Sequence, residues 1–179
     1  TDVPADCSVE IFEPFSFDTA AISYEGKIYT PTVTVKYGDE TVTTKNKSFI
    51  VEKLGEYTVT YVFDLPKGKE TYTTKVTCVD TVAPTIVAET PIAGKVEYGS
   101  TVTVPTFGVR DASGETITPT VAVYAGEVKD ENLVAVENGQ FTVDSYEKYV
   151  YLVTAEDSSG NKTADESFGF VVRQEGEFE

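Results

Sequence analysis

The chain divides at Asp80-Thr81-Val82-Ala83-Pro84-Thr85-Ile86, a short segment with a β-rich sequence on either side. Pro84 fixes its own φ angle and disfavours a helical conformation at Ala83, which predicts a link without helix. The segments on the two sides have lengths that are usual for single domains. We therefore predict two domains, residues 1–80 and 81–179, that follow one another directly.

The two segments are copies of one pattern, as ungapped comparison of the chain with itself shows. At an offset of 88 residues, six of ten positions are identical between residues 26–35 and residues 114–123. At an offset of 92, Tyr57 aligns with Tyr149. The change of offset means that the second copy has four extra residues. We place them in a surface loop near residues 126–132, where an insertion costs little.

Composition and periodicity predict an all-β fold. Val, Thr, Tyr and Phe, which favour strands, are abundant, and no stretch has a sustained helical period. Short strands separated by turns are typical of a β-sandwich. The polar residues 173–179 are expected to fray. The predicted strands are residues 7–11, 21–24, 32–37, 48–51, 56–63 and 71–79, then 101–104, 107–109, 121–124, 141–143, 149–155 and 163–172.

The composition also excludes several kinds of function. The chain has 30 Asp and Glu against 14 Lys and Arg, a formal net charge of -16, and it would repel a phosphate backbone. It has no His, so His-dependent triads and His-containing zinc sites are excluded. Apolar runs are too short to span a bilayer, and no nucleophile elbow or phosphate-binding loop occurs. We predict a protein that is not an enzyme, needs no cofactor, and neither binds nucleic acid nor inserts into membranes.

Each copy has a tyrosine at the start of a predicted strand: Tyr57 within Gly-Glu-Tyr-Thr-Val at residues 55–59, and Tyr149 in the second copy. Together with the Asp-Thr-x-Ala-Pro-x-Ile junction at residues 80–86, this pattern resembles the tandem immunoglobulin-like domains of bacterial surface and secreted proteins. The resemblance implies two β-sandwiches, each with a tyrosine corner whose hydroxyl bonds the upstream backbone. The second copy departs from the pattern at Lys148, where a small residue is expected.

The resemblance also implies where such a protein works and what it does. It implies an extracellular or cell-surface setting and a chain that we expect to be a monomer. The prediction is a non-catalytic spacer or stalk module. One alternative is an adhesin-like or carbohydrate-binding module, whose partner would be a host or cell-wall glycan or protein, and an exposed cluster of Tyr and Phe would favour it. The other alternative is an accessory region of a secreted enzyme.

Cys7 and Cys78 are the only cysteines, and they lie on the first and last predicted strands of the first segment. In immunoglobulin-like sandwiches these two strands can run side by side, so a disulfide is sterically feasible. The alternative is a pair of buried free thiols. We predict the disulfide.

The turn at residues 157–161 has oxygen-bearing side chains at alternate positions, Asp157, Ser159 and Asn161, as calcium-binding loops do. It lacks the later bidentate Glu of an EF-hand, and its counterpart in the first copy, residues 65–69, is not acidic. A tight hairpin is the favoured interpretation. We expect no metal here, with calcium as the alternative.

Overall fold

The computed structural model describes residues 1–174, and in it the chain forms two compact units, Thr1–Thr81 and Val82–Glu179. We call them unit 1 and unit 2. The fold is all-β, as predicted, and its single short helix within the described residues is the 3-10 turn η1 (Asp130–Asn132). No helix of this part of the chain is long and apolar enough to span a bilayer. Of the end expected to fray, residues 175–179 lie outside the described residues and Arg173 ends a strand.

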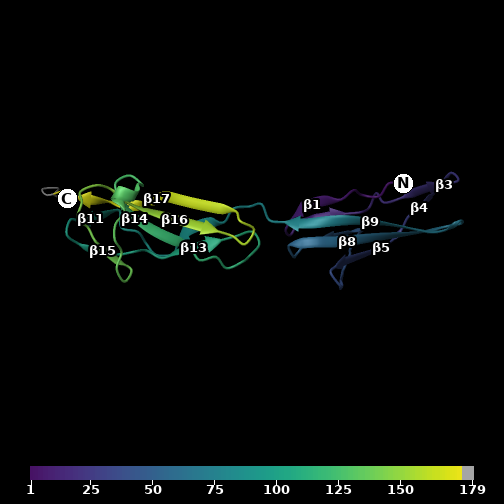
Figure 1. Cartoon of the computed structure of the whole chain (residues 1–179), viewed down its shortest axis with the longest axis horizontal. Helices are drawn as coiled ribbons and strands as arrows, with labels where there is room; N and C mark the ends of the chain where they lie inside the picture. The colour runs from purple at the N-terminus through teal and green to yellow at the C-terminus, as the bar shows by residue number, and fades with distance from the viewer. Residues whose placement is uncertain (175–179) are drawn as a thin grey trace. The chain divides into compact units, whose positions relative to one another are not determined.

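Unit 1 is a sandwich with one five-stranded sheet and two two-stranded sheets, and its long strands β8 and β9 are seen in Figure 1. The large sheet has the order β1-β9-β8-β5-β6, and the strands outside it form the pairs β2-β7 and β3-β4. The strands are β1 (Cys7–Glu10), β2 (Pro14–Ser16), β3 (Ile22–Tyr24), β4 (Lys27–Tyr29), β5 (Thr32–Tyr37), β6 (Glu40–Val42), β7 (Ser48–Ile50), β8 (Gly55–Leu65) and β9 (Gly68–Val79).

Unit 2 repeats this arrangement with a smaller main sheet, β11-β17-β16-β14, and the pairs β12-β15 and β10-β13. Its strands are β10 (Thr85–Ala88), β11 (Lys95–Glu97), β12 (Thr101–Thr103), β13 (Phe107–Arg110), β14 (Thr120–Ala125), β15 (Gln140–Thr142), β16 (Tyr149–Glu156) and β17 (Lys162–Arg173). In both units the last strand pairs in parallel with an early strand and antiparallel with the strand before it. Tyr57 and Tyr149 therefore lie at the starts of equivalent strands, β8 and β16.

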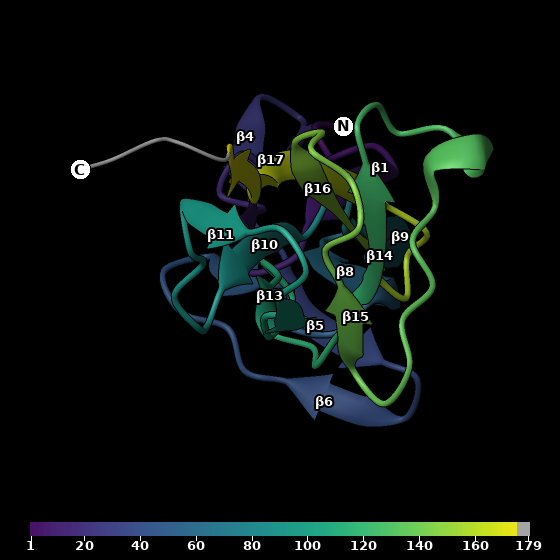
Figure 2. The same ribbon diagram turned by 90° about the vertical axis from the view of Figure 1, so that its left-hand side faces the viewer.

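The four extra residues of unit 2 lie where the change of offset predicts. Val42 of β6 pairs with Val35 of β5. In unit 2 the N–H of Val134 donates to the carbonyl of Val123, 2.8 Å away. Val123 follows Val35 by 88 residues and Val134 follows Val42 by 92, so the insertion falls between them. It contains η1, and the loop that carries η1 projects from the side of unit 2 (Figure 2).

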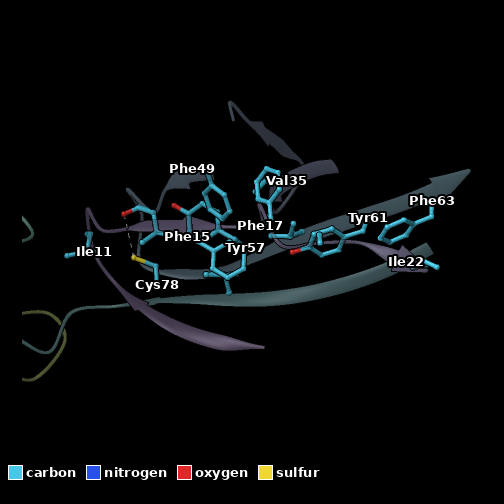
Figure 3. Packing of buried hydrophobic residues seen from close by; sticks show 14 of the residues in the cluster. Ile11, Phe15, Phe17, Ile22, Val35, Phe49, Tyr57, Tyr61, Phe63 and Cys78 are labelled. Atoms are coloured by element: carbon cyan, nitrogen blue, oxygen red, sulfur yellow. Dashed lines mark hydrogen bonds between the residues drawn. The ribbon is translucent and has the colours of Figure 1, made fainter. Parts of the chain in front are cut away.

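The core of each unit is built on a central strand with alternating burial. Along β8 every second side chain, from Tyr57 to Leu65, is buried, and β16 buries alternate residues from Tyr149 to Ala155. Aromatic rings from the facing strands pack on these residues, as Phe49 does on Tyr57 with 5.5 Å between ring centroids (Figure 3). Apolar burial on this pattern supplies the main favourable free energy of folding for each unit.

Sequence patterns did not predict five short strands, namely β2, β4, β6, β10 and β11. β4, β6 and β11 bury no side chain, so no apolar alternation marks them. β2 begins with Pro14, a residue that argues against a strand interior. β6 and β11 pair with the longer strands β5 and β17, whereas β2, β4 and β10 each pair with a strand of their own length.

Gly169 of β17 gives a test of this packing. A Cβ atom at this position would lie 2.2 Å from the carbonyl oxygen of Tyr149. We expect Gly169→Ala to lower the free energy of unfolding of unit 2 by about 3 kcal/mol, because β17 must move away from β16. The control is Gly94→Ala, whose Cβ would meet no atom within 4 Å. Urea denaturation followed by circular dichroism measures both variants, and equal stability of the two would contradict the close approach.

Candidate functional site

Tyr57 forms a tyrosine corner at the start of β8. Its hydroxyl oxygen accepts hydrogen bonds from the backbone N–H groups of Glu52 and Lys53, at 3.1 and 2.9 Å. The ring is buried, and it packs between the rings of Tyr37 and Phe49. The side chain thus anchors the loop before β8 to the core of unit 1.

Tyr149 forms the equivalent corner in unit 2. Its hydroxyl accepts from the N–H groups of Asp144 and Ser145, at 3.0 and 3.2 Å, and donates to Oδ1 of Asp144, at 3.1 Å. Burial raises the pKa of Tyr149, so the hydroxyl stays protonated and able to donate. Lys148, where the sequence pattern led us to expect a small residue, does not disturb this corner.

The link between the units begins on the surface of unit 1. The N–H and Oγ1 of Thr81 both donate to the carboxylate of Glu10, at 2.8 and 2.9 Å. β9 ends at Val79 and β10 begins at Thr85, with Pro84 directly before it and no helix between. The structural role expected of Pro84 stays a prediction.

The predicted disulfide is wrong, because Cys7 and Cys78 are both free. β1 and β9 do lie side by side, but Cys7 is opposite Val76 and Cys78 is opposite Val9. The Cα atoms of Cys7 and Cys78 are offset by two residues along the strand direction and by one strand spacing across it. They therefore lie about 8 Å apart, which is beyond the reach of a disulfide. Cys78 is buried, and its thiol donates to the carbonyl of Val51, 3.9 Å away (Figure 3). Burial raises the pKa of both thiols, and the charge of a neighbouring carboxylate adds to this.

The turn at residues 157–161 is closed by hydrogen bonds. Oδ1 of Asp157 accepts from the N–H of Asn161 at 2.8 Å, and Oδ2 accepts from its Nδ2 at 2.7 Å. Ser159 is exposed. Asn161 thus presents donors to the carboxylate, an arrangement typical of a tight hairpin. Burial raises the pKa of Asp157, but the hydrogen bonds from Asn161 and the turn backbone outweigh it, so the pKa lies below its usual value.

Asp111 lies beside this turn although it is far from it in sequence. One of its carboxylate oxygens is within 4.8 Å of a carboxylate oxygen of Asp157. Oδ1 of Asp111 accepts from the N–H of Ser113 at 2.8 Å, whereas Oδ2 is buried and accepts no hydrogen bond from the described residues. Carboxylate oxygens are the ligands that calcium prefers. The calcium alternative at Asp157, Ser159 and Asn161 stays a prediction.

An open groove lies beside the tyrosine corner in each unit. In unit 1 it has a volume of about 590 Å³ and lies between the β6 segment and the loop before β8. In unit 2 it has a volume of about 550 Å³ and lies between the η1 loop and the loop before β16. Neither groove could be predicted from sequence patterns, because each combines two loops that are separated by a strand.

Unit 2 also carries an exposed pair of stacked aromatic rings. Tyr98 and Tyr146 are 50% and 45% exposed, and their ring centroids lie 4.6 Å apart with an interplanar angle of 17°. Tyr98 follows β11 and Tyr146 precedes β16, so the pair could not be recognised from sequence spacing. At the equivalent positions of unit 1 the structure has Ile11, which is buried, and Leu54, which is half-buried.

Neither a protein-family model nor a curated protein sequence matches the chain. Among solved structures it is similar to extracellular domains 3–5 of Drosophila OTK, with 16% identity and a TM-score of 0.43 over 96% of this chain and 60% of that one. It is also similar to the insect immune protein hemolin, with 16% identity and a TM-score of 0.47 over 96% of this chain and 45% of that one. A third similar structure is that of the Clostridium thermocellum CbhA fibronectin(III)-like modules, with 17% identity and a TM-score of 0.36 over 95% and 90% of the two chains. The chain thus spans about 60% of the length of the OTK fragment.

The depressed pKa of Asp157 predicts how the stability of unit 2 depends on pH. The ionised carboxylate stabilises the fold above the unfolded-state pKa of about 3.9, and this contribution is lost as the pH falls through the lower folded-state value. We expect Asp157→Asn to destabilise unit 2 at pH 7 and to flatten the loss of stability between about pH 4 and pH 2. Urea denaturation at several pH values measures this.

The control for this prediction is Asp130→Asn, which removes an exposed carboxylate from the same unit. It should leave the pH dependence close to that of the parent protein. If both variants shift the curve equally, the effect comes from the overall charge and not from the hydrogen bonds to Asp157.

Proposed function

We propose that the chain is a non-catalytic spacer of a bacterial surface or secreted protein, built from two immunoglobulin-like modules. The observation that carries the proposal is the parallel pairing of an early strand with the last strand in each unit, β1 with β9 and β11 with β17. The start of the first strand and the end of the last strand are at opposite ends of such a pair. Tension applied through the chain therefore slides the two strands past each other and loads their hydrogen bonds together.

The strong negative charge also suits a spacer, because a net charge of -16 keeps an exposed module soluble and discourages association between copies. Each unit has its own hydrophobic core and its own tyrosine corner. A chain of such modules can lengthen a protein without depending on a partner for its fold. This is what a stalk requires.

The test is to stretch the full chain by its two ends in optical tweezers and record one unfolding event for each unit. Ile11 donates its N–H to the carbonyl of Val79, so by alternation the N–H of Val9 points to β9 and that of Ser8 points away. We expect Val9→Pro to make unit 1 unfold roughly fivefold faster at a given force, because it loses about 1 kcal/mol of ladder hydrogen bonding.

Ser8→Pro is the matched control, since a proline whose missing N–H faces away from the neighbouring strand is tolerated on an edge strand. Unit 2 should unfold unchanged in both variants. If Ser8→Pro weakens unit 1 as much as Val9→Pro does, the parallel pair is not the element that bears the load.

A carbohydrate-binding or adhesin-like role is the second candidate, and the exposed Tyr98–Tyr146 pair favours it. Each ring keeps one face turned away from its partner, and an aromatic face offers an apolar surface beside a polar hydroxyl. A glycan array probed with the parent chain and with Tyr98→Ala is the test. If the chain has this role, the parent chain binds a glycan and Tyr98→Ala abolishes that binding. Tyr29→Ala of unit 1 is the control for nonspecific contact.

A further inference from the structure

The groove beside the tyrosine corner has the same place in both units but a different lining. By the offset of 88, Ala125 of unit 2 stands where unit 1 has Tyr37. By the offset of 92, Ser145 stands where unit 1 has Lys53. All four side chains line their groove. Unit 1 can therefore serve as an internal comparison for unit 2.

The groove of unit 1 holds the ammonium group of its own lysine. Nζ of Lys53 lies 2.7 Å from Oε2 of Glu40 and 5.6 Å from the centroid of the Tyr37 ring. The hydrogen bond to Glu40, followed by the charge of that carboxylate, raises the pKa of Lys53. A carboxylate and an aromatic face are the two groups that attract an ammonium group most directly.

The groove of unit 2 has the carboxylates but lacks the cation. In unit 1 the lining includes two carboxylates, Glu40 and Glu52, and two lysines, Lys45 and Lys53. In unit 2 the lining residues include three carboxylates and no lysine or arginine, and the carboxylates belong to Glu131, Asp144 and Glu147. The serine at position 145 is too short to fill the space that Lys53 fills in unit 1.

The remaining walls of this groove suit the aliphatic part of a lysine side chain. Leu133 is 56% exposed, and Val134 and Ala125 lie next to it in the lining. A lysine buries its methylene groups against such a surface and keeps its ammonium group near charge and water. The loop that holds the extra residues of unit 2 supplies both the charge and the apolar wall. Glu131 is in η1, and Leu133 is the first residue after η1.

We propose that this groove of unit 2 binds a lysine side chain presented by a basic, extended segment of a partner protein. The ammonium group lies among the carboxylates of Glu131, Asp144 and Glu147, and its stem lies on Leu133. The net charge of -16 draws a basic partner toward the chain and opposes the approach of a second copy. The partner thus supplies to this groove the ammonium group that Lys53 supplies in unit 1.

The proposal is tested with the full chain and a blocked hexapeptide of alternating lysine and valine. Backbone amide NMR shifts during titration should concentrate on residues 131–135 and 144–147. The same peptide with acetylated lysines should cause no such shifts, since acetylation removes the charge. We expect Ser145→Lys, which supplies the internal lysine found in unit 1, and Glu147→Gln each to weaken binding by about tenfold.

Glu137→Gln is the matched control, because it removes one exposed carboxylate of unit 2 outside the groove, and it should leave the affinity unchanged. Three outcomes would overturn the proposal. They are equal binding of the acetylated peptide, equal weakening by Glu137→Gln and Glu147→Gln, or shifts spread over both units. The chain could also associate with itself in the absence of peptide, and Ser145→Lys could abolish that association. This result would place a second copy in the groove and would equally overturn the proposal.

Discussion

Alternating burial along β8 and β16 is the constraint on which the rest of each unit depends. A slip of one residue would turn Tyr57 and its neighbours on the same face out of the core. The alternation therefore fixes the register of the strands on both sides, which carry their own buried residues opposite these positions. It also places the hydroxyl of Tyr57 under the preceding loop, so the position of that loop follows from the packing of one strand.

Signals of two kinds made much of this fold predictable. Period-two alternation marks β8 and β16, and internal repetition marks the equivalence of the units and the site of the insertion. The tyrosine corners follow from the same local patterns. The sequence does not contain the register between strands that are distant along the chain. The prediction for Cys7 therefore had the right neighbouring strand, but the pairing was wrong by two residues.

The candidate site features lay further beyond sequence reasoning, since each joins residues from separate loops. Tyr98 and Tyr146 stack across two turns, and Asp111 reaches the turn of Asp157 from a loop more than forty positions earlier. No spacing rule links such pairs, because the sandwich, and not the local chain, brings them together. Ser159 meets the spacing rule for a calcium loop, and the turn that carries it is closed by hydrogen bonds from Asn161 to Asp157.

The two units show how one scaffold permits different surfaces. In the core of unit 2, Phe170 takes the position of Val76, because each of the two is opposite the corner tyrosine of its unit, and Phe170 stacks on Tyr149 with 5.0 Å between the ring centroids. At the sheet margin the units differ more, because unit 1 has the edge strand β6 where unit 2 has η1.

This difference changes how a partner can be recognised. An edge strand offers unpaired backbone groups, which bind another strand with little regard to its side chains. The η1 loop of unit 2 offers carboxylates beside an exposed leucine, which distinguish one side chain from another by charge and shape. Since an insertion in a surface loop costs little stability, the four extra residues of unit 2 change the groups that the sheet margin offers while the alternation in the core stays intact.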